Sequence, residues 1–338
     1  MSETRSSIDS LPVRTRSERW KSVVRFVDRR LRALFVIAWL PVFLSWLGRR
    51  HWIFDNLTSF VVQYAIAGGG LLVAFLLLRR PVWALAAAIM LGTNLFRFWP
   101  AGEPPVAAGA GEPFRVVSAN VKTTNRQFDR FTQFVRKTEP DLLLVLETDD
   151  DWITALEALE PDLPHAIVAP RQDNFGIALF SRQPFDEARV VELGESHVPT
   201  IVARLTRDGR PITDVGTHPL PPARSALAAE RNRQLDAVAE FANGLPGEVI
   251  LMGDLNLSPW SPCFGDLLRE SRLADSRVGF GIQPTWPAGF PLMLTPIDHL
   301  LVSEGLTVLD REVGSEIGSD HLPVVATIAV RREGAAPP

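Results

Sequence analysis

The sequence contains very little cysteine and tyrosine. Cys263 is the one cysteine and Tyr64 the one tyrosine among 338 residues. A lone cysteine forms no internal disulfide, which excludes a small disulfide-stabilised scaffold, and with scattered histidines it cannot build a structural zinc site. The hydrophobic content of 46% also excludes a disordered or collagen-like chain. A metal ion bound by this protein must therefore be held mainly by oxygen atoms.

The charge of the chain is divided unevenly. Residues 1–113 contain 14 Lys and Arg against 7 Asp and Glu, whereas residues 114–338 contain 21 against 32. The first part therefore carries a net charge of +7 and the second a net charge of −11. The total length is enough for one large domain or two ordinary ones, and the charge division indicates two regions with different surroundings.

The N-terminal region is typical of a membrane anchor. Residues 1–32 carry nine basic side chains and no long apolar run, which predicts a solvated cytoplasmic arm. Apolar segments follow at 33–48, 57–78 and 82–96, separated by short turns that contain arginine. The middle segment has no formal charge and is long enough to cross a hydrocarbon core of about 30 Å. The outer two are shorter and need flanking Arg and Trp side chains at the interface. We predict about three transmembrane helices.

The positive-inside rule sets the orientation of this anchor. The basic residues before the first apolar segment place the N-terminus in the cytoplasm. Three crossings then place the rest of the chain outside a bacterial-type inner or plasma membrane, as part of a multi-pass membrane protein. If the first segment lay in the interface instead, the C-terminal domain would be cytoplasmic. Residues 99–113 are rich in Pro, Gly and Ala and predict a linker, followed by a domain at 114–331 and a tail at 332–338.

Short apolar runs bounded by turn residues alternate with a few helical patterns from Phe114 onward, as in an α/β or α+β domain. Helices are expected at 125–138, 149–159 and 222–243, the first two with Asn or Asp at the start. The expected strands are residues 114–121, 141–147, 165–170, 175–181, 200–205, 212–218, 248–255, 298–303, 306–310 and 323–330.

Polar side chains stand at the ends of several of these strands, where a sheet interior would not place them. They are Asn120, Glu147, His218, Asp254 with Asn256, Asp298, and Asp320 with His321. Taken singly, each is more often a turn residue, a cap or a structural histidine. Six strand ends in one domain that each offer an oxygen ligand or an imidazole favour a shared functional site.

The motifs around these residues resemble those of a known superfamily. SANVK, PDLLLVLE, THP, GDLNLSP, PIDH and GSDHLP occur in this order over residues 118–323. They are similar to the successive motifs of the endonuclease/exonuclease/phosphatase superfamily, which includes pancreatic-type deoxyribonucleases, abasic-site endonucleases, sphingomyelinases and inositol-polyphosphate phosphatases. The resemblance implies a four-layered DNase I-like fold. In this fold two mixed β-sheets pack face to face with helices outside, and the active site lies at one end of the sandwich.

The resemblance also implies a metal ion. Glu147 would be the principal ligand of Mg²⁺, with Asn120 and Asp320 beside it, and Mn²⁺ is an alternative ion. Mg²⁺ prefers hard oxygen ligands and retains several waters, so one or two carboxylates and the substrate phosphate suffice. Lys122 stands where several nucleases of the superfamily have an acidic or amide residue. The sequence therefore does not decide between one metal ion and two.

The remaining motif residues carry the chemistry that the resemblance implies. Asp254 and Asn256 would position the attacking water and the scissile phosphate, and His218 would contact the phosphate or the leaving oxygen. Asp298 would orient His321. A histidine paired with a carboxylate favours its charged form and can bind phosphate electrostatically. Asp254 is then the favoured base for water, or a residue that only orients it.

Four further residues are candidates for contact with substrate, namely Asn125, Asn174, Arg224 and Arg231. For the two arginines, a solvated helix face is the alternative interpretation. The active-site tyrosine of the abasic-site enzymes has no counterpart in the domain, because Tyr64 lies in the apolar front part, and His218 stands instead.

The charge of the domain bears on the substrate. A domain at −11 repels a long polyanion, whereas a nonspecific nuclease needs Lys and Arg to neutralise phosphates. The membrane helices and the catalytic domain together are similar to membrane phosphatases linked to glycopeptide-antibiotic resistance, which implies a phosphate or pyrophosphate substrate linked to an isoprenoid lipid. An extracytoplasmic nuclease and a catalytically silent membrane-tethered binding module are the alternatives.

Large apolar side chains are expected in loops beside the site. Trp260, Trp286, Phe290 and Leu292 could dip into lipid headgroups or grip a lipid chain, or they could simply cap the core of the sandwich.

Overall fold

The ten predicted strands are all present in the computed structural model, which describes residues 15–98 and 109–332. The first group of strands comprises β1 (Phe114–Asn120), β2 (Leu142–Leu146), β3 (His165–Ala169), β4 (Ile177–Ser181), β11 (Leu306–Val313) and β12 (Val324–Val330). The second group comprises β5 (Glu187–Glu192), β6 (Pro199–Arg207), β7 (Arg210–Thr217), β8 (Glu248–Asp254), β9 (Ala274–Asp275) and β10 (Asp298–Val302). The sequence did not predict β5 and β9. β5 is an exposed edge strand without an apolar run, and β9 has only two residues.

Each group forms one mixed sheet. Among the described residues, the first has the strand order β11-β12-β1-β2-β4-β3 and the second β5-β6-β7-β8-β10-β9. Successive side chains along a strand point to opposite faces of the sheet, so one face of each sheet contributes apolar side chains such as Val116, Leu144, Ile201 and Ile250 to a core between the sheets. The outer face of each sheet is also apolar and packs against helices.

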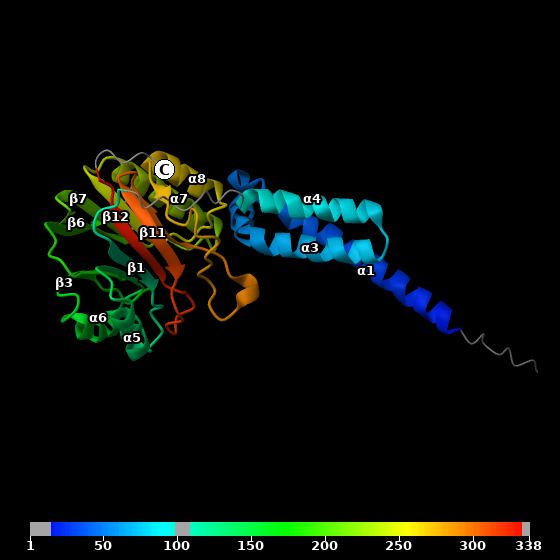
Figure 1. Cartoon of the computed structure of the whole chain (residues 1–338), viewed down its shortest axis with the longest axis horizontal. Helices are drawn as coiled ribbons and strands as arrows, with labels where there is room; N and C mark the ends of the chain where they lie inside the picture. Colours follow the sequence, from blue (N-terminus) through cyan, green and yellow to red (C-terminus); the bar gives the residue numbers. More distant parts are fainter. Residues whose placement is uncertain (1–14, 99–108, 333–338) are drawn as a thin grey trace, which may run out of the picture.

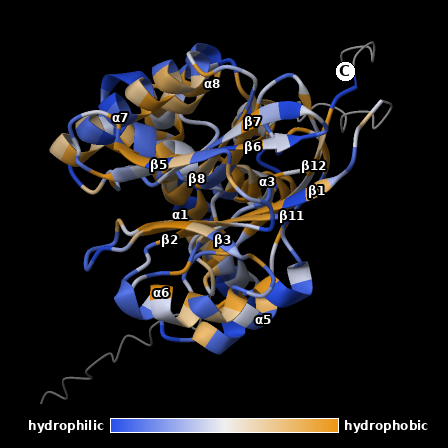
Figure 2. Ribbon diagram, turned by 90° about the vertical axis from the view of Figure 1, so that its left-hand side faces the viewer, coloured by the Kyte–Doolittle hydropathy of each residue, from blue (hydrophilic) through white to orange (hydrophobic). Residues whose placement is uncertain are grey.

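Helices cover both outer faces of the sandwich. They are α5 (Phe128–Thr138), α6 (Asp150–Leu156), α7 (Ser225–Asn243) and α8 (Pro262–Ser271), with short 3-10 turns at Glu157–Leu159 and Pro291–Met293. In Figure 2, α7 and α8 lie on one side of the two sheets, and α5 and α6 lie on the other. The predicted four-layered DNase I-like architecture is confirmed.

The predicted helix boundaries hold only in part. Asp149 caps α6 as expected, because its Oδ1 accepts a hydrogen bond from the Trp152 amide at 2.9 Å. Asn125 does not begin α5, which starts three residues later, since the Asn125 side chain holds the preceding turn and accepts from the Gln127 amide at 3.0 Å. The sequence did not predict α8, which begins with Pro262 directly after the cap residue Ser261.

A stalk of three long helices precedes the domain and projects away from it (Figure 1). The helices are α1 (Arg16–Ser45), α3 (Val61–Leu77) and α4 (Pro81–Phe98), and α2 (Trp52–Asn56) lies between the first two, flanked by 3-10 turns at Gly48–Arg50 and Leu57–Phe60. The basic arm predicted at 1–32 is helical from Arg16, because Thr15 and Glu18 form a capping box that starts α1. Residues 1–14 of that arm lie outside the described residues.

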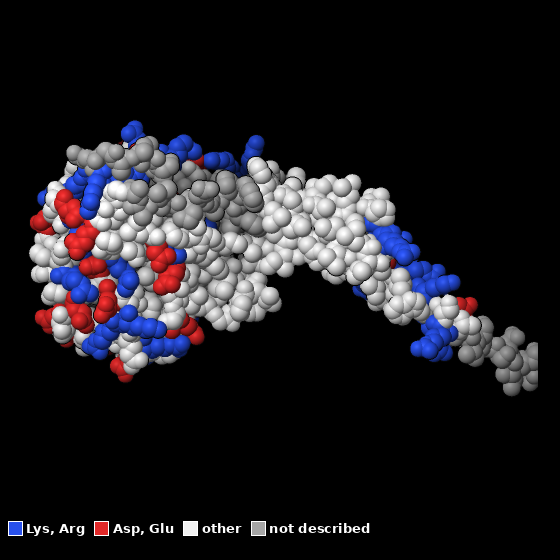
Figure 3. Space-filling model, viewed as in Figure 1, with Lys and Arg blue, Asp and Glu red and all other residues white. Residues whose placement is uncertain are grey.

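The stalk carries an apolar surface between two charged ends. Figure 3 shows a belt without Lys, Arg, Asp or Glu between the domain and the basic first half of α1. Large side chains such as Ile37, Ile66 and Leu85 are more than half exposed in this belt. A surface of this kind on a monomer marks contact with a membrane or a partner.

One helix among the described residues is long and apolar enough to cross a membrane. It is Trp52–Leu77, with 26 residues, and the apolar helix Pro81–Arg97 is shorter. By length and composition the structure therefore supports one spanning helix and not the predicted set of about three, because half of α1 is charged and α4 is short. Residues 99–108 of the predicted linker and 333–338 of the predicted tail lie outside the described residues.

Candidate active site

The polar strand ends converge at one end of the sandwich because of the directions of the strands. β1 and β2 run parallel, so Asn120 and Glu147 emerge at the same edge of their sheet. β7 and β8 also run parallel and bring His218 beside Asp254. β10 runs antiparallel to β8, which pairs its first residue, Asp298, directly with Asp254. The loop before β12 then adds the remaining residues, since β12 is antiparallel to β1.

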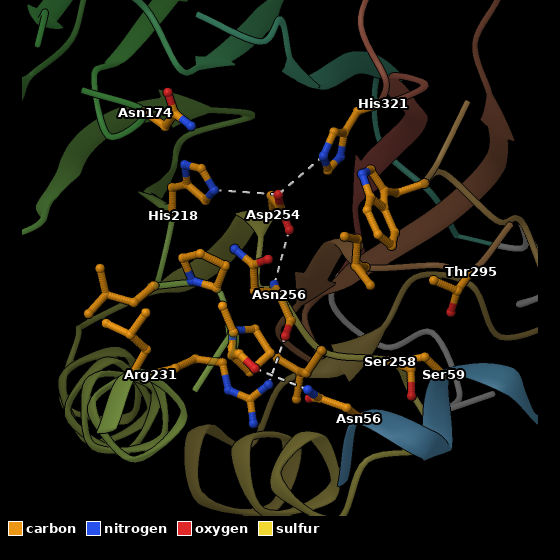
Figure 4. A pocket seen from close by; sticks show the side chains of 18 of the residues that line it. Asn56, Ser59, Asn174, His218, Arg231, Asp254, Asn256, Ser258, Thr295 and His321 are labelled. Carbon is orange, nitrogen blue, oxygen red and sulfur yellow. Dashed lines mark hydrogen bonds and ion pairs between the residues drawn. The ribbon is translucent and has the colours of Figure 1, made fainter. Parts of the chain in front are cut away.

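A cavity of about 900 Å³ opens at this end of the domain. Figure 4 shows the labelled histidine and carboxylate side chains pointing into it. The sequence-predicted residues that line it are Glu147, Asn174, His218, Arg231, Asp254, Asn256, Asp320 and His321.

Asp254 lies at the centre of the polar cluster and is 2% exposed. Its Oδ2 lies 3.4 Å from Nε2 of His218 and 3.6 Å from Nε2 of His321, and it accepts a hydrogen bond from the Asn120 amide at 3.2 Å. Its Oδ1 accepts from the backbone N–H of Asn256 at 3.0 Å. Burial alone would raise the pKa of Asp254, but the two histidines lower it to about 2. The carboxylate is therefore held in its charged form.

His321 is held by two carboxylates. Its Nδ1 lies 2.9 Å from Oδ2 of Asp298, which is the pair that the motif resemblance implies. Burial lowers the pKa of His321, but the charges of Asp298 and Asp254 outweigh it and raise the pKa to about 9. The ring is therefore an imidazolium at neutral pH, with Nε2–H directed toward Asp254 and the cavity.

His218 has a similar electrostatic position. Burial lowers its pKa, whereas the hydrogen bond and charge of Asp254 and the charge of Glu147 raise it, and the net direction is upward. Its ring lies 5.4 Å from that of Phe175. Two histidines whose charged forms are favoured face one cavity, which makes the cavity attractive to an anion such as phosphate.

Glu147 is linked to Asp254 through the Asn120 side chain, which donates to both carboxylates. Its two oxygens accept hydrogen bonds from the Asn120 side chain at 2.8 Å and from the Thr123 amide at 3.2 Å. Asp320 lines the same cavity and pairs with the Lys122 ammonium at 3.3 Å. Glu147 and Asp320 thus offer hard oxygen donors of the kind that Mg²⁺ prefers. Asn120 turns its amide nitrogen toward Glu147, and its oxygen accepts from the Lys122 backbone N–H at 3.0 Å.

A second group also has the spacing of a metal site. Asp254, Asp298 and His321 place one possible ligand atom each within 4.8 Å of one another. His321 is a poor ligand there, because its Nδ1 is engaged by Asp298 at 2.9 Å and its Nε2 lies 3.6 Å from Asp254. The chemistry of the donors therefore fits a divalent metal better beside Glu147.

The backbone is strained where these groups meet. Lys122, Glu147 and Asn256 have positive φ angles of 60°, 63° and 53°, and all three line the cavity. Gly253 has a φ of 151°, and a Cβ at this position would lie 1.9 Å from the Thr217 carbonyl oxygen. The glycine of the GDLN motif is thus required for β7 and β8 to bring their ends together. Strain of this kind is typical of functional sites.

The candidate substrate contacts are placed differently from one another. Asn174 lines the cavity. Asn125 does not line it. Its side-chain amide donates to the carbonyls of Val121 and Ile317, so the structure does not place Asn125 for the predicted contact with substrate. Arg224 is exposed at the N-terminus of α7, outside the cavity lining. Arg231 borders the cavity but is 1% exposed, which contradicts the solvated helix face.

The sequence did not predict that the stalk contributes to this cavity. Asp55, Asn56, Ser59 and Phe60 line it, together with Phe175 and Trp286 from the domain. Figure 4 shows Asn56 and Ser59 facing the cavity from the stalk segment. Asp55 was the available signal, because it is an acidic residue just before a long apolar run.

The sequence of the domain matches a family model. The model of the endonuclease/exonuclease/phosphatase family matches residues 117–321, which is more than half of the chain. The chain belongs to the endonuclease/exonuclease/phosphatase family. Membership confirms the resemblance of the motifs and makes the protein a metal-dependent hydrolase of phosphate ester bonds.

Solved structures share the fold at low sequence identity. The family member from Beutenbergia cavernae is 20% identical, with a TM-score of 0.53 over 65% of this chain and 72% of that one. The member from Bacteroides vulgatus is 18% identical, with a TM-score of 0.55 over 65% and 100%. The catalytic domain of human Nocturnin is 18% identical, with a TM-score of 0.54 over 64% and 94%. No curated protein matches the sequence closely enough to count as a relative.

Proposed function

We propose that the protein is a membrane-anchored phosphohydrolase that removes or cleaves a phosphate or pyrophosphate group carried by a membrane lipid. The observation that carries the proposal is the position of the cavity. Its lining combines the histidine and carboxylate cluster with Asn56, Ser59 and Phe60 of the apolar stalk. A phosphate bound at the cluster would therefore have its organic part next to the stalk.

The residues of the cluster have different roles in the proposed hydrolysis. The His321 imidazolium and His218 donate hydrogen bonds to the phosphoryl oxygens and stabilise the charge that develops on them. Asp254 is ionised and central, so it holds the attacking water in place. A carboxylate with so low a pKa is a weak base, so it mainly orients the attacking water. It accepts the proton of that water only as the bond between the water oxygen and phosphorus forms. Asn256 lines the cavity next to Asp254 and would position the phosphate.

Glu147 and Asp320 would hold Mg²⁺ or Mn²⁺ in this proposal, with the Asn120 amide beside them orienting Glu147. The ion would supply Lewis-acid neutralisation of the phosphoryl oxygens. Glu147 supports it best, because it is 9% exposed and its carboxylate has no basic side chain among its hydrogen-bond donors in the described chain. Asp320 is shared with Lys122, which favours one strongly held metal ion over two.

The surroundings of the cavity support a lipid substrate over nucleic acid. Phe60, Leu220, Leu227 and Ile297 give the cavity an apolar wall. On the face shown in Figure 3, acidic and basic side chains intermingle over the domain, and the net charge after residue 113 is −11. A continuous basic groove, which a long polyanion requires, is not a feature of that face.

The membrane proposal goes beyond the one helix that meets the length criterion. We propose that α1, α3 and α4 cross together, because their apolar exposed side chains form one belt and their charged residues lie at its two ends. Phe290 and Leu292 are 55% and 76% exposed in a loop that is tied to the stalk by a hydrogen bond of 3.0 Å from the Gln63 side chain to the Leu294 carbonyl. This loop would rest on lipid headgroups.

The substrate class is tested with the full-length protein in detergent micelles. Initial rates are compared, with and without Mg²⁺, for a phosphomonoester, an isoprenoid pyrophosphate, a sphingomyelin-type diester and plasmid DNA at low salt. We expect Mg²⁺-dependent release of phosphate from the lipid substrate to exceed cleavage of DNA. Strong nuclease activity without action on lipid phosphates would replace the proposal with the extracytoplasmic nuclease. No hydrolysis of any substrate would favour the silent binding module.

The topology needs its own test. Protease added to intact spheroplasts should remove the domain after residue 108, whereas a cytoplasmic control protein stays intact. A domain that is digested only after the membrane is permeabilised would place it in the cytoplasm and contradict three crossings.

A further inference from the structure

The catalytic loop of the domain is held by the stalk. β8 ends at Asp254, Asn256 follows, and residues 257–262 then run along the stalk. Thr58 Oγ1 lies 2.9 Å from Ser258 Oγ, and the Arg97 guanidinium donates to the Trp260 carbonyl at 3.3 Å. The segment that directly continues the GDLN motif is thus bonded to two different stalk elements.

Asp55 makes the strongest of these contacts. Its Oδ1 accepts a hydrogen bond from the Ser261 hydroxyl at 2.6 Å, and its Oδ2 accepts from the Arg231 guanidinium at 2.6 Å. Asp55 is 5% exposed and Arg231 is 1% exposed. Loss of one partner of such a pair leaves an uncompensated buried charge, which is far more costly than loss of an exposed pair.

Arg231 carries this contact to the active site. Its other terminal nitrogen donates to the backbone carbonyl of Asn256 at 2.7 Å. Asn256 has a positive φ of 53° and donates its own N–H to Asp254. A residue in this backbone conformation needs surrounding bonds to hold it. The chain of contacts therefore runs from Asp55 through Arg231 to Asn256 and Asp254.

We infer that residues 55–60 of the stalk are a positioning element of the active site, in which Asp55 acts through Arg231 to hold the Asn256 backbone and the loop after it. Asp55 touches no reacting group and is a positioning residue. The stalk also packs closely on the far end of this loop, where a Cβ added to Gly48 would lie 3.1 Å from the ring of Pro262. The inference rests on hydrolysis at the site, but not on the identity of the substrate.

The test is Asp55→Asn in the full-length protein. Bis(p-nitrophenyl) phosphate is the substrate, at saturating Mg²⁺, because it is water-soluble and carries no lipid chain. We expect kcat to fall by about tenfold to a hundredfold with a change in KM below about threefold, since small displacements of reacting groups weaken turnover more than binding. Hydrogen exchange of the backbone amides in residues 253–262 should become faster. Wild-type kcat and unchanged exchange would overturn the inference.

Arg49→Gln is the matched control. Arg49 pairs with Asp266 at 2.5 Å across the same contact between stalk and domain, but it is 62% exposed and outside the cavity lining. Its loss should leave kcat and KM unchanged. An equal loss of kcat in this control would show a general weakening of the contact and would overturn the role of Asp55.

A second variant covers the case in which Asp55→Asn does not fold. The double variant Asp55→Leu with Arg231→Met removes both buried charges and preserves apolar volume. It should fold but still lose kcat, because the hydrogen bond to the Asn256 carbonyl is absent. A folded double variant with wild-type kcat would overturn the inference. If the wild-type protein hydrolyses no phosphate ester, the proposed function fails, and the exchange measurement still decides whether the stalk holds the loop.

Discussion

Asp298→Asn gives the sharpest test of the histidine cluster. The substitution keeps the shape of the side chain and removes the charge that lies 2.9 Å from Nδ1 of His321. Burial lowers the pKa of His321, and the carboxylates of Asp298 and Asp254 raise it to about 9 from its ordinary value of 6.5. That net rise corresponds to roughly 3 kcal/mol in favour of the imidazolium.

The size of the expected effect follows from how this stabilisation is shared. Asp298 is the largest of the favourable charges and also contributes a hydrogen bond, so its removal should cost at least roughly half of the total. At pH 10, where the protonated fraction of His321 scales with this stabilisation, we expect kcat/KM to fall by about 20-fold, and by about 300-fold if the whole stabilisation is lost, at about 1.4 kcal/mol for each factor of ten. His321→Ala should cause a similar loss. The double variant should be no worse than the more impaired single variant, because the two residues act as a unit.

The pH dependence has a definite sign. Activity that needs the His321 imidazolium is present below its pKa and is lost as pH rises through about 9. In Asp298→Asn the loss should begin at lower pH. The assay is kcat/KM for bis(p-nitrophenyl) phosphate between pH 6 and 10 with saturating Mg²⁺. A variant within twofold of wild type over this range, or single effects that multiply in the double variant, would refute the reasoning.

Glu192→Gln is a matched control for this experiment. Glu192 forms a histidine–carboxylate pair of similar length with His197, at 2.7 Å, but both side chains are more than half exposed and lie outside the cavity lining. Exposed pairs contribute little. The control should therefore leave kcat/KM and its pH dependence unchanged.

Three further predictions concern the metal and the core. Glu147→Gln should lower turnover by about a hundredfold or more and weaken its dependence on Mg²⁺, as measured by metal titration of the initial rate; unchanged turnover would remove Glu147 from the metal site. Lys122→Gln should lower the apparent Kd for Mg²⁺ by up to about fivefold, because it frees Asp320 from a partly exposed ion pair. A higher Kd would mean that Lys122 helps the site to bind the metal ion. Asp214→Asn should raise the thermal unfolding temperature at pH 8 more than at pH 5. Burial raises the pKa of Asp214 well above 3.8, so its native state holds a proton that the unfolded chain releases, and stability is lost as pH rises; equal shifts at both pH values would contradict this.

The sequence alone was sufficient for most of the domain. Apolar runs long enough for one strand each, bounded by turn residues, predict ten of the twelve strands of the described residues, and Asp149 predicts the start of α6. The polar residues at the strand ends and their order along the chain predict the family and the pairing of Asp298 with His321. These signals are local, because a motif of four to eight residues carries each of them.

The tertiary structure decided what depends on distant contacts. Arg231 and Asn125 have the polarity of substrate-binding residues, but folding commits Asn125 to two backbone carbonyls and buries Arg231 against Asp55, 176 residues away in the chain. No local pattern predicts that pair, since an acidic residue beside an apolar helix is equally consistent with a solvated turn. Only the packing of the stalk against the loop after Asp254 removes water from both charges and makes the stalk one wall of the active site.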